Sequence, residues 1–98
     1  MVGAADMDRL REELNQLNAL GGDDAIAERL APWRPGSVAG EARRCALAHY
    51  LQAALDLPGG VSASDQFASI DGAPEPLIPL PRLVAEYQRA DAGGQYPR

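Results

Sequence analysis

The sequence of 98 residues has no lysine, one cysteine and one histidine. A single cysteine cannot form an internal disulfide, and a metal site needs about four ligands, which Cys45 and His49 alone cannot supply. No uncharged apolar stretch comes near the roughly 20 residues of a membrane helix, and no charged start precedes an apolar segment and a cleavage site. These absences predict a cytoplasmic protein that needs no metal, other cofactor or membrane.

Aromatic residues are also few, at 5% of the chain, whereas apolar residues make up 46% and charged residues 23%. The last two fractions are near the average of folded soluble proteins, which argues against disorder and against a fibrous or repeat protein. The length is sufficient for one hydrophobic core and too short for two. We therefore expect one globular domain over residues 1–98.

Negative charge predominates, because fourteen acidic residues outnumber the arginines and give a net charge of −5. Phosphate backbones and anionic membranes repel such a chain. The distribution is uneven, since residues 33–52 contain one acidic residue and the three arginines Arg34, Arg43 and Arg44. This stretch is the part of the chain that favours an anionic partner.

Apolar residues that recur three and four positions apart predict four helices. Asp6 is the expected cap of the first helix, and Asp23 or Asp24 that of the second. Glycine and proline are expected to end each helix. The predicted helices cover residues 6–20, 23–31, 41–57 and 81–92, with a loop at 32–40.

The pattern becomes β-like between the last two helices. Short runs around Val61 and at 67–70, separated by Ser64-Asp65-Gln66, predict a hairpin. Leu77-Ile78 stands between prolines and predicts a short edge strand, because proline cannot donate to a β-ladder. The expected fold is a mainly helical α+β single domain with three helices, a small antiparallel β element and a C-terminal helix.

Three segments resemble known sequences: Arg44–Leu51, Pro79–Pro81 and Asp91–Pro97. They resemble a set of small uncharacterised proteins from GC-rich bacterial genomes. Those proteins share a Cys-x-Leu-Ala-x-Tyr-Leu helix, a short strand region and a Pro-Leu-Pro helix that ends in Asp-Ala-Gly before Tyr-Pro. Many of them have proline where this chain has Ala46. The resemblance implies a shared fold and a cytoplasmic location, and it implies no activity.

Cys45 and His49 are four residues apart, so a helix would place them on one face, as a thiolate–imidazolium pair or two metal ligands require. The alternative is a buried structural thiol and a histidine at the helix boundary. We assign no catalytic and no metal-binding residue, because the spacing identifies neither an orienting third group nor an oxyanion site. A Cys/His-dependent enzyme is the third of three hypotheses.

The acidic residues Asp65, Asp71 and Glu75 lie in the loop-rich region, where paired carboxylates could act as acid and base or bind a cation. They match no calcium-loop spacing and coincide with predicted turns, which favours a role in turn formation. Ser62 and Ser64 match no nucleophile motif. The sequence therefore contains no enzyme signature.

The order of helices, loop, helix and hairpin resembles a winged helix in outline, which gives a DNA-binding alternative. Arg43 and Arg44 would then stand at the start of the third helix and contact phosphate or guanine. Asp65 and Asp71 in the predicted wing have the wrong sign for this role. We therefore expect a protein partner and not a nucleic acid.

Trp33 and Tyr96 lie in irregular segments beside proline and are candidate anchors for a partner. Together with Arg34, Arg43 and Arg44 they form the predicted partner-binding residues. The leading hypothesis is a small acidic, non-enzymatic protein-binding or regulatory domain, of which a nucleic-acid mimic is a narrower form. The apolar stripe from Met7 to Leu17 is the candidate seam of a homodimer.

Overall fold

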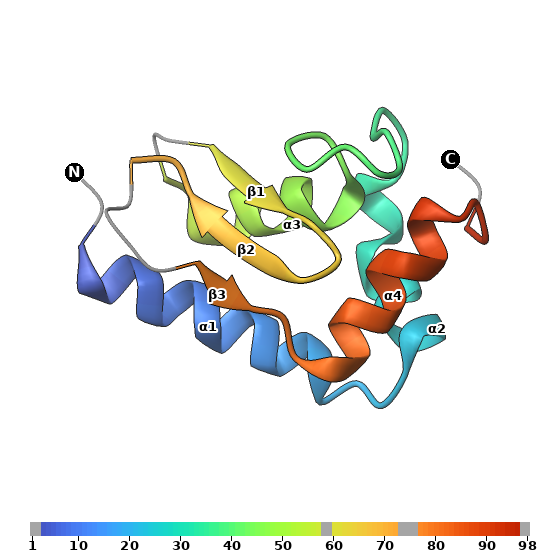
Figure 1. The fold of residues 1–98 in the computed structure, drawn as a ribbon, viewed down its shortest axis with the longest axis horizontal. Coiled ribbons are helices and arrows are strands. Elements are labelled where there is room, and N and C mark those ends of the chain that lie inside the picture. Colours follow the sequence, from blue (N-terminus) through green and yellow to red (C-terminus); the bar gives the residue numbers. More distant parts are fainter. Residues whose placement is uncertain (1–2, 58–59, 73–76, 97–98) are drawn as a thin grey trace.

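The computed structural model describes residues 3–57, 60–72 and 77–96, and it confirms the α+β class. Within these residues four α-helices and a three-stranded antiparallel sheet follow in the predicted order (Figure 1). The elements are α1 (Ala4–Asn18), α2 (Asp23–Leu30), the 3₁₀ turn η1 (Ala31–Trp33), α3 (Ala46–Leu55), β1 (Val61–Ala63), β2 (Phe67–Ile70), β3 (Ile78–Pro79) and α4 (Arg82–Ala92).

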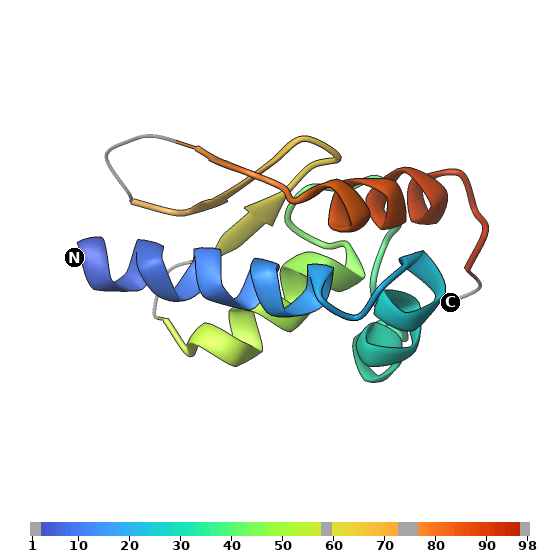
Figure 2. The ribbon, with the colours of Figure 1, turned by 90° about the horizontal axis from the view of Figure 1, so that it is seen from below.

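Two layers make up the fold. Figure 2 shows the sheet and α4 in one layer and α1, α2 and α3 in the other. The sheet covers α3 through β1, while α4 contacts both α1 and α2. Buried side chains from both layers meet in one hydrophobic core.

The stripe of α1 is part of that core. Leu10, Leu14 and Leu17 are each at most 1% exposed, and Met7 packs against the same cluster. The 3.6-residue period therefore identified the buried face of this helix. It also means that the homodimer seam expected between Met7 and Leu17 is wrong, because the protein's own α3 and α4 cover that face.

The third helix is shorter than the predicted 41–57. It begins at Ala46, and residue 45 is its N-cap. A hydrogen bond to β1 accounts for the later start. The carbonyl oxygen of Ala42 accepts the Ala63 N–H at 2.8 Å, whereas in a helix it would accept an N–H four residues further along the chain. The loop before α3 thus runs along the outer edge of β1.

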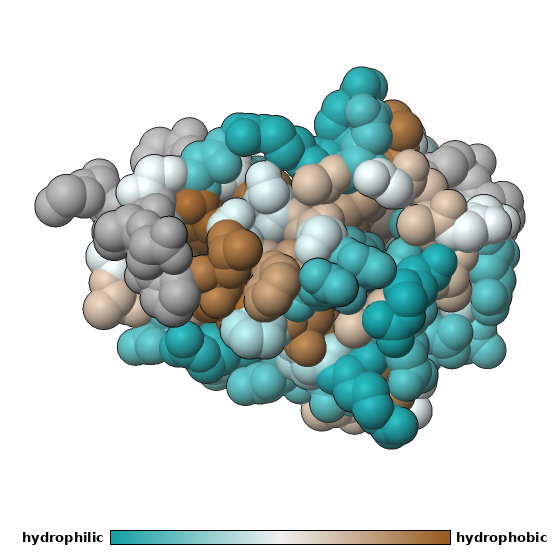
Figure 3. All heavy atoms as spheres, in the orientation of Figure 1, coloured by the Kyte–Doolittle hydropathy of each residue, from teal (hydrophilic) through white to brown (hydrophobic). Residues whose placement is uncertain are grey.

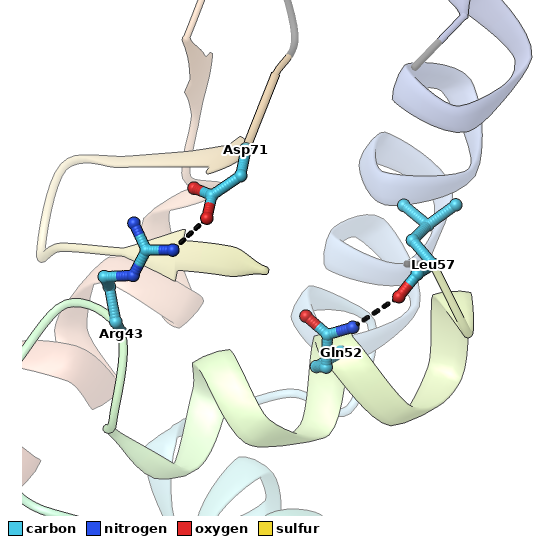
Figure 4. Close-up of polar contacts among 4 residues, drawn as sticks. All are labelled: Arg43, Gln52, Leu57 and Asp71. Atoms are coloured by element: carbon cyan, nitrogen blue, oxygen red, sulfur yellow. Dashed lines mark hydrogen bonds and ion pairs between the residues drawn. The ribbon is translucent and has the colours of Figure 1, made fainter. Parts of the chain in front are cut away.

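The end of α3 also differs from the expectation. Asp56 takes the left-handed conformation, with φ of 50°, and ends the helix before the predicted Pro58-Gly59-Gly60 break, of which residues 58 and 59 lie outside the described residues. The Gln52 side chain then donates a 2.8 Å hydrogen bond to the carbonyl oxygen of Leu57 (Figure 4). Asp tolerates this backbone conformation better than most residues because its short side chain bonds locally.

The sheet has the strand order β1-β2-β3 and confirms the predicted hairpin. Val61 pairs with Ile70 in the first ladder, and Phe67 pairs with Pro79 in the second. Side chains alternate between the two faces of a strand, so one face meets the core and the other stays open. The buried face consists of Val61, Ala63, Ala68, Ile70 and Ile78.

The caps are shifted from the expected residues. Gly3 is the N-cap of α1, and Asp6 stands inside the first turn, where its Oδ2 accepts the Gly3 N–H at 3.1 Å. Gly22 is the N-cap of α2, with Asp23 and Asp24 in the first turn. Carboxylates at these positions still act favourably on the helix dipole.

The N-terminus of α4 is capped from another helix. Asn18, the last residue of α1, accepts a 2.9 Å hydrogen bond from the Leu83 N–H through its Oδ1. Pro81, the N-cap residue, has no side chain that could do this. A contact over 65 positions of sequence therefore satisfies one of the free N–H groups of α4.

We predict that Asn18→Ala lowers the free energy of unfolding by about 1 kcal/mol, because the half-buried Leu83 N–H loses its acceptor. Asn18→Asp keeps an acceptor oxygen and should remain within about 0.5 kcal/mol of the original chain. Urea unfolding followed by circular dichroism measures both changes. Equal stability of the Ala variant and the original chain would contradict the cap.

Candidate functional site

Cys45 and His49 do not form a pair. The Cys45 side chain is 2% exposed, and its Sγ accepts the Ala48 N–H at 3.5 Å as the cap of α3. No side-chain hydrogen bond joins it to His49 among the described residues, and the thiol instead lies 3.7 Å from the Gln88 Nε2. Those residues also contain no group of three or more His, Cys, Asp or Glu that could hold a metal. The Cys45 side chain therefore caps the N-terminus of α3.

Gln88 is the residue that sequence reasoning missed. It is 6% exposed, and its Nε2 donates to the carbonyl oxygens of Ser64 at 3.0 Å and Ala63 at 3.4 Å. The signal was available, because Gln88 lies four positions after Val84 on the buried stripe of α4. A polar side chain at a core position needs hydrogen-bond partners, and here the end of β1 supplies them.

A cleft of about 350 Å³ opens beside Gln88. It lies between the loop before α3, the β1–β2 turn and the second half of α4, and Cys45 and Gln88 both line it. Asp65 from the turn and Arg89 from α4 are exposed lining residues. Its other lining residues are the small Gly40, Ala42, Ala63, Ser64 and Ala92.

A second, shallower hollow of about 140 Å³ lies on the open face of the sheet. Phe67 and Leu77 line it, and they are the large hydrophobic side chains that stay exposed in the described chain, at 40% and 51%. Figure 3 shows hydrophobic residues over the sheet. The hollow and the cleft share Ala42, Ala63 and Ser64, so the two form one continuous surface.

Arg43 and Arg44 lie in the loop before α3 and not on the helix. Arg43 forms an ion pair with Asp71 at the end of β2 (Figure 4), and Arg44 lies 3.6 Å from Glu41. Residue 60 is glycine, and a Cβ there would lie 3.0 Å from the Asp71 Oδ2, so the pair occupies the space of a side chain. Both arginine side chains remain 64% exposed.

Helix α3 lacks the free face that the recognition helix of a winged helix needs. Six of the ten residues of α3 are buried, among them Leu47 and Leu51. A recognition helix needs a free face with base-contacting side chains at its N-terminus, whereas Cys45 and Ala46 begin this helix and are buried. The prediction that Arg43 and Arg44 stand on the third helix is wrong.

Arg34 and Tyr96 lie close together, and both side chains contact other residues of this chain. The Arg34 guanidinium lies 5.8 Å from the centre of the Tyr96 ring, and its Nη1 donates to the Ala27 carbonyl at 2.7 Å. Tyr96 stacks on Tyr87 with 5.5 Å between ring centres, and its hydroxyl donates to the Asp24 Oδ1 at 2.9 Å. These contacts attach the C-terminal segment to α2.

Trp33 is half-buried in η1, which confirms that it folds back on the core. Its ring meets the ring of Tyr50 edge-on at 5.0 Å between centres. The Tyr50 hydroxyl in turn donates to the Glu13 Oε1 of α1 at 2.9 Å. Trp33 thus joins η1 to α3. It lines neither the cleft nor the hollow.

The structure describes two of the three acidic residues of the loop-rich region, Asp65 and Asp71, and they have different surroundings. Asp71 is paired with Arg43, Asp65 lines the cleft, and Glu75 lies outside the described residues. Ser64 supports the turn, since its Oγ accepts the Phe67 N–H at 3.0 Å. Asp65 lies in the bend between β1 and β2, and Asp71 lies in the turn that follows β2.

Comparison with models of protein families, with curated proteins and with solved structures finds no match to this chain. The resemblance carried by Arg44–Leu51 stays a prediction. Within the described residues no helix is both long and apolar enough to cross a membrane.

We predict that Gln88→Leu lowers the free energy of unfolding by about 1–3 kcal/mol, because the carbonyls of Ala63 and Ser64 lose a buried donor. Gln16→Leu, on the exposed face of α1, is the matched control and should change stability by less than about 0.5 kcal/mol. Chemical unfolding of both variants provides the measurement. A loss no larger than that of the control would show that the Gln88 amide does not support the fold.

We predict an alkaline loss of stability. Burial, followed by the hydrogen bond to Asp24 and the nearby Asp23, raises the pKa of Tyr96, and burial with Glu13 raises the pKa of Tyr50. The folded protein therefore keeps protons that the unfolded chain loses above about pH 10, so stability falls as pH rises from there. Tyr96→Phe should flatten this fall in unfolding curves between pH 8 and 11. An unchanged slope would exclude Tyr96 as a cause.

Proposed function

We propose that the protein is a non-enzymatic protein-binding module whose contact surface is the open face of the sheet. The observation that carries this proposal is the position of Phe67 and Leu77 over one hollow. Single exposed hydrophobic residues are ordinary on protein surfaces. Two that line the same hollow, one on β2 and the other directly before β3, are better explained as the centre of an interface.

The partner packs on the face of the sheet and does not extend it by a strand. The Ala63 N–H at the outer edge of β1 is already bonded to Ala42, and β3 contains Pro79, which has no N–H. Both edges are therefore poor templates for a further strand. The face between them is the accessible surface.

Charge indicates the chemistry of the partner. Arg43 and Arg44 follow Ala42, which lines the hollow, and their ion pairs are exposed, so carboxylates of a partner can replace Asp71 and Glu41 at little cost. Two copies of a chain with a net charge of −5 repel each other. We therefore assign the face to a different protein, one that presents apolar side chains next to carboxylates.

The test is selection from a displayed library of random peptides. Peptides are selected on the original chain and then screened against the double variant Phe67→Ser/Leu77→Ser. We expect enriched peptides that combine apolar residues with Asp or Glu, and at least about tenfold weaker binding to the double variant. Arg43→Gln/Arg44→Gln should weaken binding less and reduce its dependence on salt.

Arg11→Gln/Arg82→Gln removes two exposed arginines of α1 and α4 and is the matched control for the arginine pair. Thermal unfolding of every variant checks that the fold is intact. Peptides that bind the double variant as well as the original chain would refute the assignment of this face. Light scattering that detects a dimer, and a monomer for Phe67→Ser/Leu77→Ser, would assign the face to a second copy instead.

A further inference from the structure

The cleft next to the sheet contains an amide group that is held in one orientation. The Gln88 Nε2 faces the carbonyl oxygens of Ser64 and Ala63 and the Cys45 Sγ. Two carbonyl oxygens require donors, which fixes the amide nitrogen on that side. The Gln88 Oε1 accepts no hydrogen bond from any described residue. It is the polar atom that this buried side chain offers to the cleft.

Two opposite charges accompany that oxygen. Asp65 lies on the β1–β2 turn and Arg89 directly follows Gln88 on α4. Both residues are exposed, both line the cleft, and neither forms an ion pair with a described residue. The cleft therefore presents an anion, a cation and a fixed neutral acceptor to a ligand.

We propose that this cleft binds a free α-amino acid as its zwitterion. The ammonium group donates to the Asp65 carboxylate and to the Gln88 Oε1, and the carboxylate accepts from the Arg89 guanidinium. The walls of Gly40, Ala42 and Ala92 have little side-chain bulk and leave room for the ligand's own side chain. A volume of about 350 Å³ is sufficient for a molecule of this size.

The same set of groups disfavours other ligand classes. A phosphate or nucleotide would meet one arginine together with a carboxylate and an acceptor oxygen, which repel its charge. A cation alone would leave Arg89 without a counterpart and close to a like charge. A zwitterion is the class that satisfies all three groups at once.

The site is independent of the proposed protein contact. The amino acid uses Asp65, Gln88 and Arg89, whereas the partner protein uses Phe67 and Leu77. The two surfaces share only small residues of the sheet and the neighbouring loop. Either proposal can therefore fail without the other.

The test is a titration of the ¹⁵N-labelled protein with each of the twenty free amino acids, to about 10 mM, followed by NMR. We expect at least one of them to shift the side-chain amide of Gln88 and the backbone amides of Asp65 and Arg89. The N-acetyl form of that amino acid, which lacks the ammonium group, and its amide form, which lacks the carboxylate, should each bind at least about tenfold more weakly. No shift in the cleft with any of the twenty, or equal binding of a blocked form, would overturn the proposal.

Asp65→Asn and Arg89→Gln should each weaken binding at least about tenfold. These side chains are exposed and form no ion pair with a described residue, so the variants are expected to fold, and circular dichroism checks this. Asp56→Asn, at the far end of α3, and Arg82→Gln, at the start of α4, are the matched controls and should bind as the original chain does. Equal losses in the control variants would also overturn the proposal.

Discussion

The structure depends on the hydrogen bonds of one buried amide. The Gln88 side chain of α4 donates to Ser64 and Ala63 at the end of β1 and contacts the thiol of Cys45 at the start of α3. Three segments that are distant in the sequence are thereby fixed at one point. Because the amide is buried, each of these bonds is costly to lose, and the relative position of the three segments is determined.

Both surfaces follow from that junction. The loop before α3 is bonded to β1 through Ala42 and Ala63. These two residues lie between the cleft and the hollow on the sheet and line both of them. Beyond the residues that both share, the cleft is lined by the polar Asp65, Gln88 and Arg89, and the hollow by the apolar Phe67 and Leu77. A polar ligand and an apolar partner can thus bind close together on one small protein.

Several residues expected to contact a partner are engaged within the protein. Arg34 and Tyr96 attach the C-terminal segment to α2, and Trp33 packs on Tyr50. The reason is general, because arginine, tyrosine and tryptophan make the same stacking and hydrogen-bonding contacts inside a fold as across an interface. The composition of a loop therefore does not distinguish the two uses.

The sequence by itself determined the class of fold, the order of the elements and the buried face of α1. These features depend on the spacing of apolar residues such as Leu10, Leu14 and Leu17, which is a local property of the chain. It also predicted the hairpin, through the β-leaning run of β2 and the turn at Ser64.

Only the tertiary structure decided where α3 begins, what caps α4 and where the candidate site lies. The hydrogen bond from the Ala63 N–H of β1 to the Ala42 carbonyl moved the start of α3 to Ala46, and Asn18 of α1 supplied the cap of α4. Gln88 became the centre of a cleft because its acceptors belong to another element. Each of these outcomes depends on a hydrogen bond between groups far apart in the sequence, whose meeting no local pattern encodes.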